Sequence, residues 1–159
     1  MRAFRVVDAS GSTLKLDGED TSNIEIFPAG GGGGKLRKVN AWVQLDRTLN
    51  HNSSGGEART VNVKFIESEN EIVLNDGFTA INRTFDMDAD QLGTAGYTAL
   101  RTFTQTGKDT VIRQATPGNT FNLIVGKVSL SEEVVLTDGQ VMVVRGSIAA
   151  QSRSTRYAV

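Results

Sequence analysis

Apolar and polar residues alternate along several short stretches of this chain, which is typical of half-buried β-strands. The alternation is clearest at 39–45, 61–65, 78–87, 121–130 and 141–148, and shorter apolar stretches lie at 4–7, 13–16, 24–27 and 110–114. Glycine, asparagine and aspartate separate most of these stretches, as turn residues do between antiparallel strands. The pattern predicts a mainly β fold, built as an antiparallel β-sandwich or barrel-like sheet.

One stretch has the period of a helix instead. From about 94 to 106, Tyr97, Leu100 and Phe103 recur at every third residue, which predicts one short α-helix with a narrow apolar stripe. Asp88 and Asp90 lie just upstream, where the positive end of a helix favours acids. Gly107 follows the stretch and is well placed to end the helix in a left-handed cap.

The stretch from 46 to 59 is the most polar part of the chain and offers little that could pack in a core. We predict that it forms a long exposed loop or an extended hairpin tip, and loops of this length are usually functional or disordered. The whole chain, residues 1–159, has the length of one domain. Its two ends are expected to be flexible arms.

Five consecutive glycines, Gly30–Gly34, precede Lys35 and raise the question of a phosphate-binding loop. The Walker motif needs glycine at its first position and serine or threonine after its lysine. Ala29 and Leu36 occupy those two positions, and the residues that follow alternate like a strand. The glycine run is therefore interpreted as flexible backbone.

Composition removes several classes of function. The 159 residues include no cysteine and a single histidine, His51, which excludes disulfides, thiolate zinc sites and thiol nucleophiles. The net charge of −1 argues against a dedicated nucleic-acid-binding protein, which normally carries a basic patch. No apolar stretch approaches the roughly 18 residues of a membrane span, and the first residues lack an apolar signal core. We expect no membrane partner.

Three alternate aspartates, Asp86, Asp88 and Asp90, imitate the start of a calcium-binding loop. Such a loop requires glycine at its sixth position and glutamate at its twelfth, and Gln91 and Tyr97 stand there instead. The sequence therefore predicts no catalytic residue, no metal site and no cofactor. We expect a structural protein rather than an enzyme.

The second half of the chain contains, in order, the helical stretch GYTALRTF, the stretch FNLIVGKVSLSEEV and the closing stretch VMVVRGSIAA. With its order of strand, acidic turn, helix and further strands, the region 78–150 resembles the tail tube (major tail) proteins of tailed bacteriophages. The resemblance implies a β-sandwich flanked by a helix. It also implies six copies in a ring, and rings that stack into a hollow tube conducting DNA.

The same resemblance implies the partners and the location. The partners are other copies of the chain, other phage tail proteins, and DNA in transient, non-specific passage. The protein is expected in the virion tail, assembled in the host cytoplasm. Two polar or glycine-rich segments are then expected to make contacts between subunits: Thr48, Leu49, Asn50, His51, Asn52, Ser53, Ser54, Gly55 and Gly56, together with Gly30, Gly31, Gly32, Gly33 and Gly34.

Two other classes of protein remain as alternatives. One is another viral structural protein, such as a capsid decoration protein or a jelly-roll coat subunit, although a jelly roll has about eight strands and does not require the helix. The other is a small ligand-binding β module or carbohydrate-binding module. That class usually clusters its aromatic residues, whereas Trp42, Tyr97 and Tyr157 are scattered along this chain.

Overall fold

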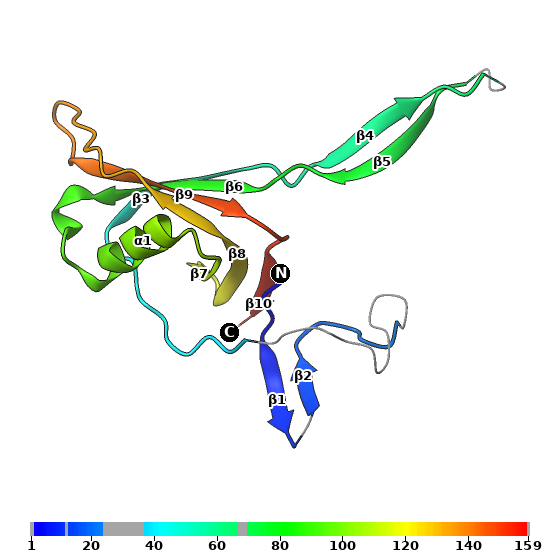
Figure 1. Ribbon diagram of the computed structural model, residues 1–159, viewed down its shortest axis with the longest axis horizontal. Coiled ribbons are helices and arrows are strands. Elements are labelled where there is room, and N and C mark those ends of the chain that lie inside the picture. Colours follow the sequence, from blue (N-terminus) through cyan, green and yellow to red (C-terminus); the bar gives the residue numbers. More distant parts are fainter. Residues whose placement is uncertain (1, 12, 24–36, 67–69, 159) are drawn as a thin grey trace.

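The computed structural model describes residues 2–11, 13–23, 37–66 and 70–158. The fold is mainly β with one α-helix in the described residues, as the sequence predicts (Figure 1). In chain order the elements are β1 (Val6–Ser10), β2 (Thr13–Leu16), β3 (Thr48–Ser54), β4 (Ala58–Val63), β5 (Ile72–Phe78), β6 (Asn82–Asp88), the 3-10 turn η1 (Ala89–Gln91), α1 (Ala95–Thr106), β7 (Thr110–Thr116), β8 (Thr120–Leu130), β9 (Val143–Ala150) and β10 (Thr155–Ala158).

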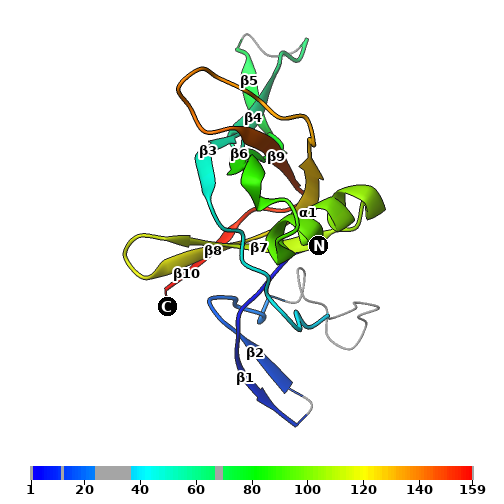
Figure 2. The same cartoon turned by 90° about the vertical axis from the view of Figure 1, so that its left-hand side faces the viewer.

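The central element is a six-stranded antiparallel sheet in the order β10-β8-β9-β6-β3, with β7 paired to β8. β9 pairs with the second half of β8, whereas β7 and β10 flank its first half. The sheet curls along β8, so that β7 and β10 lie at an angle to β6 and β9 (Figure 2). The predicted strands at 110–114, 121–130 and 141–148 are confirmed as β7, β8 and β9 with small shifts of their ends.

Helix α1 covers one face of this sheet. The hydroxyl of Thr94 accepts a hydrogen bond from the backbone N–H of Tyr97 at 3.3 Å, which caps the first turn. Gly107 ends the helix in the left-handed conformation, with φ of 59°. Tyr97 and Leu100 are buried against the sheet, together with Phe85, Met87, Ile124, Val128, Leu130, Val144 and Ile148. The helix predicted from the spacing of apolar residues is confirmed.

The core leaves no room for a side chain at position 146. A methyl group built on Gly146 would lie 2.3 Å from the ring carbon Cζ of Phe85, whose ring is itself buried. We therefore expect Gly146→Ala to lower the free energy of unfolding by about 1–3 kcal/mol, the usual range for overpacking a core. Ser147→Ala, one residue along on the opposite face, should stay within about 0.5 kcal/mol of the wild type. Chemical denaturation of both variants measures the difference, and equal stabilities would refute this account.

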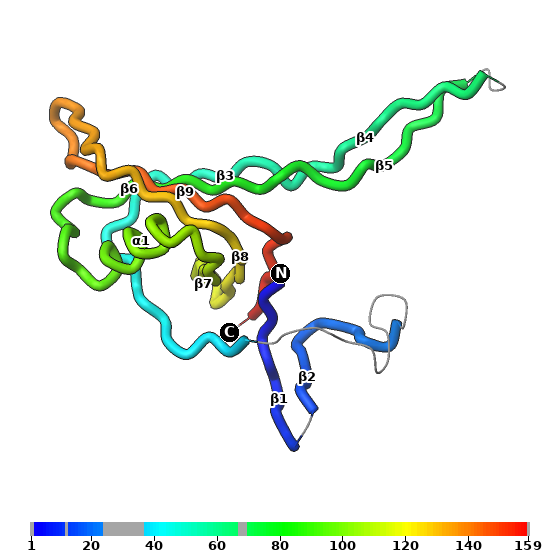
Figure 3. The backbone as a smooth tube through the Cα atoms, viewed as in Figure 1, coloured from blue at the N-terminus to red at the C-terminus, as the bar shows by residue number. Residues whose placement is uncertain are grey.

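Two pairs of strands extend away from the central sheet (Figures 1 and 3). β1 and β2 form a hairpin near the N-terminus, and β4 and β5 form a second two-stranded unit, here called the ribbon (58–63 and 72–78). The ribbon continues the β3–β6 pair through hydrogen bonds at the junction, from Gly56 N to Thr79 O at 3.1 Å and from Thr79 N to Glu57 O at 2.9 Å. β3, β4, β5 and β6 therefore build one long arm, bent at this junction.

The arm corrects two of the sequence-based expectations. The loop predicted at 46–59 is wrong, because Thr48–Ser54 is strand β3 and pairs with β6. Backbone hydrogen bonds hold this edge strand, so it needs none of the apolar side chains on which the prediction relied. The strand predicted at 78–87 is confirmed as β6 from residue 82, but it starts later than predicted, because 79–81 form the bend and Phe78 is the last residue of β5.

Three further stretches differ from the prediction or lie beyond it. Residues 39–45, predicted as a strand, are described but belong to no sheet, because alternation alone does not supply a pairing partner. The strand predicted at 24–27 and the run Gly30–Gly34 lie outside the described residues. The sequence predicts no strand near the C-terminus, where Thr155–Ala158 forms β10 and pairs with β8.

Candidate functional site: a polar sheet face and an apolar ribbon

The candidate catalytic and metal-binding groups do not come together in the described structure. Within 2–11, 13–23, 37–66 and 70–158, no group of three or more His, Cys, Asp or Glu side chains could hold a metal ion. His51 lies exposed on the edge strand β3, with its ring stacked on Phe85 at 6.0 Å between centroids and its Nε2 3.0 Å from the hydroxyl of Thr48. No helix in the described part of the chain is long and apolar enough to cross a membrane.

The face of the sheet opposite α1 is polar over β3, β6, β9 and the second half of β8, whereas Phe121, Leu123 and Val125 in the first half of β8 are buried. Side chains alternate between the two faces of each strand, so the neighbours of the buried residues on β6, β9 and the second half of β8 point away from the core. The strand register aligns them in cross-strand rows, of which the most regular is Asn52–Thr84–Ser147–Ser129. We call this surface the polar face, and define it by Asn52, Ser54, Asn82, Thr84, Asp86, Lys127, Ser129, Arg145, Ser147 and Ala149.

The charges on the polar face are compensated within the subunit. Asp86 lies 3.8 Å from the Nε of Arg145, and it accepts a hydrogen bond from the side-chain amide of Asn50 at 2.9 Å. The Nζ of Lys127 donates to the carbonyl of Gly107 at 2.8 Å and lies 3.9 Å from Asp109. Each charged group on the polar face therefore has an opposite charge nearby. The surface consists mainly of hydroxyl and amide groups around a shallow depression.

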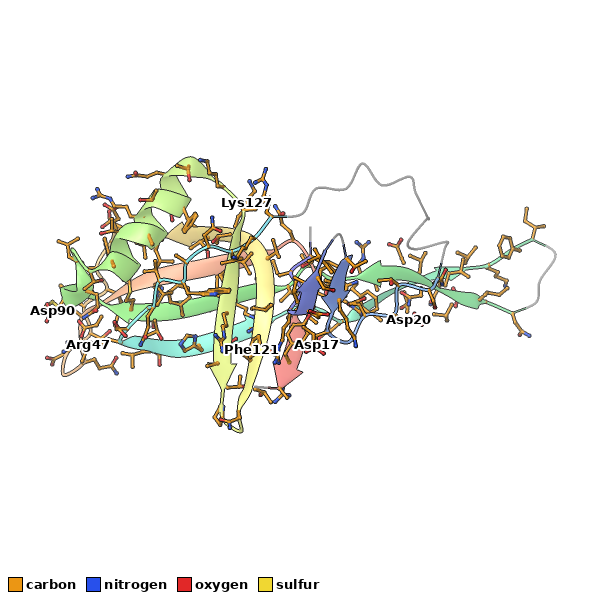
Figure 4. The ribbon with its side chains drawn as sticks, turned by 90° about the horizontal axis from the view of Figure 1, so that it is seen from below. Asp17, Asp20, Arg47, Asp90, Phe121 and Lys127 are labelled. Atoms are coloured by element: carbon orange, nitrogen blue, oxygen red, sulfur yellow. The ribbon has the colours of Figure 1, made fainter. Side chains whose placement is uncertain are left out.

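Asp88 ties the end of β6 to the chain that enters β3. Its side chain is buried, accepts a hydrogen bond from the backbone N–H of Asp90 at 3.0 Å, and pairs with the guanidinium of Arg47 at 3.1 Å. Figure 4 shows Arg47 and Asp90 together at this end of the sheet. The backbone N–H of Asp90, followed by Arg47, lowers the pKa of Asp88 below its ordinary value. Asp88 is thus a structural carboxylate that fixes where the edge strand starts.

Because of this arrangement, the contribution of Asp88 to the stability of the folded protein depends on pH. Its folded-state pKa lies below the unfolded value of about 3.9. The stabilisation is therefore complete above that unfolded value and is lost as the pH falls through the folded pKa. We expect the wild type to lose its stability advantage over Asp88→Asn progressively below about pH 4. Urea unfolding of the two proteins between neutral and acid pH tests this, and parallel pH profiles would contradict it.

The ribbon exposes a continuous apolar surface. Cross-strand pairing places Val61 opposite Leu74 and Val63 opposite Ile72, on the same side of the ribbon. We call these four residues the ribbon face; Val61, Leu74 and Ile72 are 44%, 47% and 43% exposed. An isolated two-stranded unit is at best marginally stable in water, and contiguous exposed apolar groups mark interaction surfaces. The ribbon face is therefore a candidate contact with another chain.

The predicted contact residues that the structure describes lie on the arm built from β3, β4, β5 and β6. Thr48–Ser54 form β3, whose outer edge has no partner strand in the described part of the chain. Gly55 and Gly56 lie at the bend between β3 and the ribbon, and Gly30–Gly34 are outside the described residues. Sequence reasoning missed the ribbon face as a contact, although the alternation of Val61 and Val63 was visible.

A solved structure and a protein-family model are similar to this chain. Among solved structures, one chain in "Tail of empty GTA particle computed with helical refinement, C6 symmetry" is similar, with 14% sequence identity and a TM-score of 0.48 over 70% of this chain and 82% of that one. No curated protein sequence matches. The model of the family described as "Phage tail tube protein, TTP" matches residues 1–159. Because this match spans the whole chain, the protein belongs to the phage tail tube protein family.

Proposed function

We propose that copies of this tail tube protein associate into six-membered rings, and that the rings stack into a hollow tube whose lumen is lined by the polar face. The observation that carries the proposal is the asymmetry of the central sheet. One face is covered by α1 and holds the main core, while over β3, β6, β9 and the second half of β8 the other presents rows of hydroxyl and amide groups with compensated charges. A sheet face of this composition suits an aqueous channel better than contact with another protein.

The lumen would conduct DNA without holding it. Proteins bind the DNA backbone mainly through lysine and arginine side chains that neutralise phosphates. On the polar face Arg145 lies beside Asp86, and Lys127 is engaged by Gly107 and Asp109. The wall therefore offers a passing polyanion little to bind. In this proposal the protein has no catalytic role and meets DNA only during transient passage in a tail assembled in the host cytoplasm.

Contacts between subunits would come from the edge of the sheet and from the arm. The outer edge of β3 pairs with no other strand in the described ranges, and an open edge favours pairing with a strand of another chain. The ribbon continues the β3–β6 pair and extends away from the core, so the ribbon face can reach a neighbouring copy (Figure 3). Other copies would be the main partners, with other tail proteins at the two ends of the tube.

Electron microscopy of the purified protein tests assembly directly. We expect rings or long hollow cylinders in negative stain, growing in number with protein concentration. A protein that stays monomeric by sedimentation at high concentration, in low and high salt, would overturn the proposal.

The assignment of the lumen has its own test, because the chain has no cysteine and a single introduced thiol can be labelled cleanly. Ser129 lies exposed on the polar face and Thr98 lies exposed on α1, on the opposite side of the sheet. In assembled tubes, a bulky polymer-linked maleimide should label Thr98→Cys but not Ser129→Cys, whereas a small maleimide should label both. In dissociated subunits the bulky reagent should reach both thiols. If the bulky reagent labels the two variants equally in tubes, Ser129 does not face the lumen.

A further inference from the structure

Residues 39–45 have the side-chain pattern of a strand but no strand partner in the described part of the chain. The backbone of 38–43 makes no hydrogen bond with another described residue. Val39, Trp42 and Val43 are 40%, 50% and 50% exposed. Unpaired backbone combined with exposed β-branched and aromatic side chains is what a strand shows before its partner binds.

One end of this segment is fixed to the subunit. Gln44 and Leu45 pass so close to the first turn of α1 that a methyl group on Gly96 would lie 2.6 Å from the carbonyl oxygen of Gln44. Leu45 also packs against the core. The segment 39–43 therefore extends from an anchored position, which lowers the entropy it would lose on pairing with another strand.

Strand β7 offers a matching edge. It pairs with β8 on one side, and no strand in the described part of the chain pairs with its other side. β7 carries Val111, Ile112 and Ala115 between its polar residues. Two other edges of the central sheet lack a partner strand in the described part of the chain. β10 has only four residues, and β3 carries only polar residues from Asn50 to Ser54, so it would leave Val39 and Val43 without apolar neighbours.

We propose that residues 39–43 add as an antiparallel strand to the outer edge of β7 in a second copy of this chain; this rests on the self-association proposed above. The register that fits best places Val43 opposite Val111 and Trp42 opposite Ile112. Continuing it places Asn40 opposite Gln114 and Val39 opposite Ala115. Aromatic and β-branched residues stabilise each other when they lie opposite in adjacent strands.

The ends of this pairing are also complementary. The register brings Asp46, just after the segment, next to Lys108, just before β7. Both side chains are exposed, and neither forms an ion pair within the described subunit. Opposite charges at this position favour the antiparallel direction, since a parallel arrangement would place Asp46 beyond the other end of β7.

The partner must be another copy, because the anchor prevents pairing within one chain. Gln44 lies at the start of α1, whereas β7 begins after its end. The helix of 12 residues spans about 18 Å at 1.5 Å per residue. Each copy therefore offers a strand at one place and an edge at another. Such a head-to-tail contact closes into a ring when a whole number of identical rotations between neighbouring copies adds up to a full turn.

Trp42 reports on this contact without any substitution, because it is the only tryptophan in the chain. We expect its fluorescence emission to shift to shorter wavelength when subunits assemble, and its quenching by acrylamide to fall several-fold. If tubes form but Trp42 remains as accessible as in the subunit, the strand-addition proposal is wrong while the tube function stands. If no assembly occurs at any concentration, both proposals fail.

Two adjacent proline substitutions test the pairing itself. Successive N–H groups of a strand point to opposite sides, and proline removes one of them. Asn40→Pro and Ala41→Pro should both leave the thermal midpoint of the subunit unchanged, because neither N–H is hydrogen-bonded to a described residue. One of the two should prevent assembly, while the other assembles like the wild type. Assembly of both variants, or failure of both, would overturn the addition of this segment as an edge strand.

Discussion

Val61→Asp should abolish tube assembly while leaving the subunit folded. Val61 lies at the centre of the ribbon face, opposite Leu74, and its side chain is exposed in the subunit. Outside the core, an exposed substitution of this kind usually changes stability by no more than about 0.5 kcal/mol. The central sheet, which holds the buried cluster, makes no use of Val61.

In an assembled tube the same substitution would be costly. Val61 is 44% exposed in the subunit, so covering the rest of its side chain contributes about 1 kcal/mol, and the variant loses this contribution. Placing an unpaired carboxylate in an apolar contact adds a further penalty of several kcal/mol. Because each 1.4 kcal/mol is a factor of ten in affinity, the protein concentration needed for assembly should rise by at least about 100-fold. Sedimentation and negative-stain microscopy measure this threshold.

Asn62→Asp is the matched control, because it introduces the same charge one residue along. Asn62 pairs with Val73, so it lies on the side of the ribbon opposite the ribbon face. This variant should assemble at close to the wild-type threshold. If Asn62→Asp fails as completely as Val61→Asp, the contact is not specific to the ribbon face. If Val61→Asp assembles normally, the ribbon face is not a contact at all.

The elements that local chemistry defines were predictable from the sequence. Helix α1 has a capping threonine before it, an apolar residue at every third position and a glycine after it, and all of these signals lie within about four turns of chain. Strand β9 and the second half of β8 are buried on one face, and their alternation reflects that burial, whereas Leu123 to Gly126 of β8 are buried on both faces. In these elements the same residues specify the local conformation and the core contact.

The arm was not predictable in the same way. β3 contains asparagine, histidine and serine, which have low strand propensity, and it is a strand only because β6 supplies a row of backbone partners. Residues 39–45 give the opposite error, with strong alternation and no partner strand among the residues that the structure describes. Pairing between distant segments is a property of the whole fold, so the side-chain pattern of one segment does not determine it. Both errors fall on surfaces that we assign to contacts between copies.

The bend that aims the ribbon depends on Gly55. Its φ of 87° is a conformation that residues with a side chain rarely adopt. A methyl group at this position would also lie 1.9 Å from the carbonyl oxygen of Ala80. That oxygen belongs to the backbone of the facing strand connection, so it cannot move aside without shifting the junction hydrogen bonds between Gly56, Glu57 and Thr79. We expect Gly55→Ala to keep the folded core but to redirect the ribbon and block assembly.

Gly77→Ala separates the effect of the left-handed backbone conformation from the effect of the collision with Ala80. Gly77 has a φ of 90°, but its added methyl group would meet no atom within 4 Å. Both variants therefore carry the left-handed backbone penalty of about 1–2 kcal/mol, and only Gly55→Ala adds the collision. We expect Gly77→Ala to form tubes and Gly55→Ala to remain as subunits, with similar near-ultraviolet circular dichroism from the core in both. If both variants form tubes, the contacts between copies do not depend on the direction of the ribbon. The ribbon would then not set the geometry of the tube.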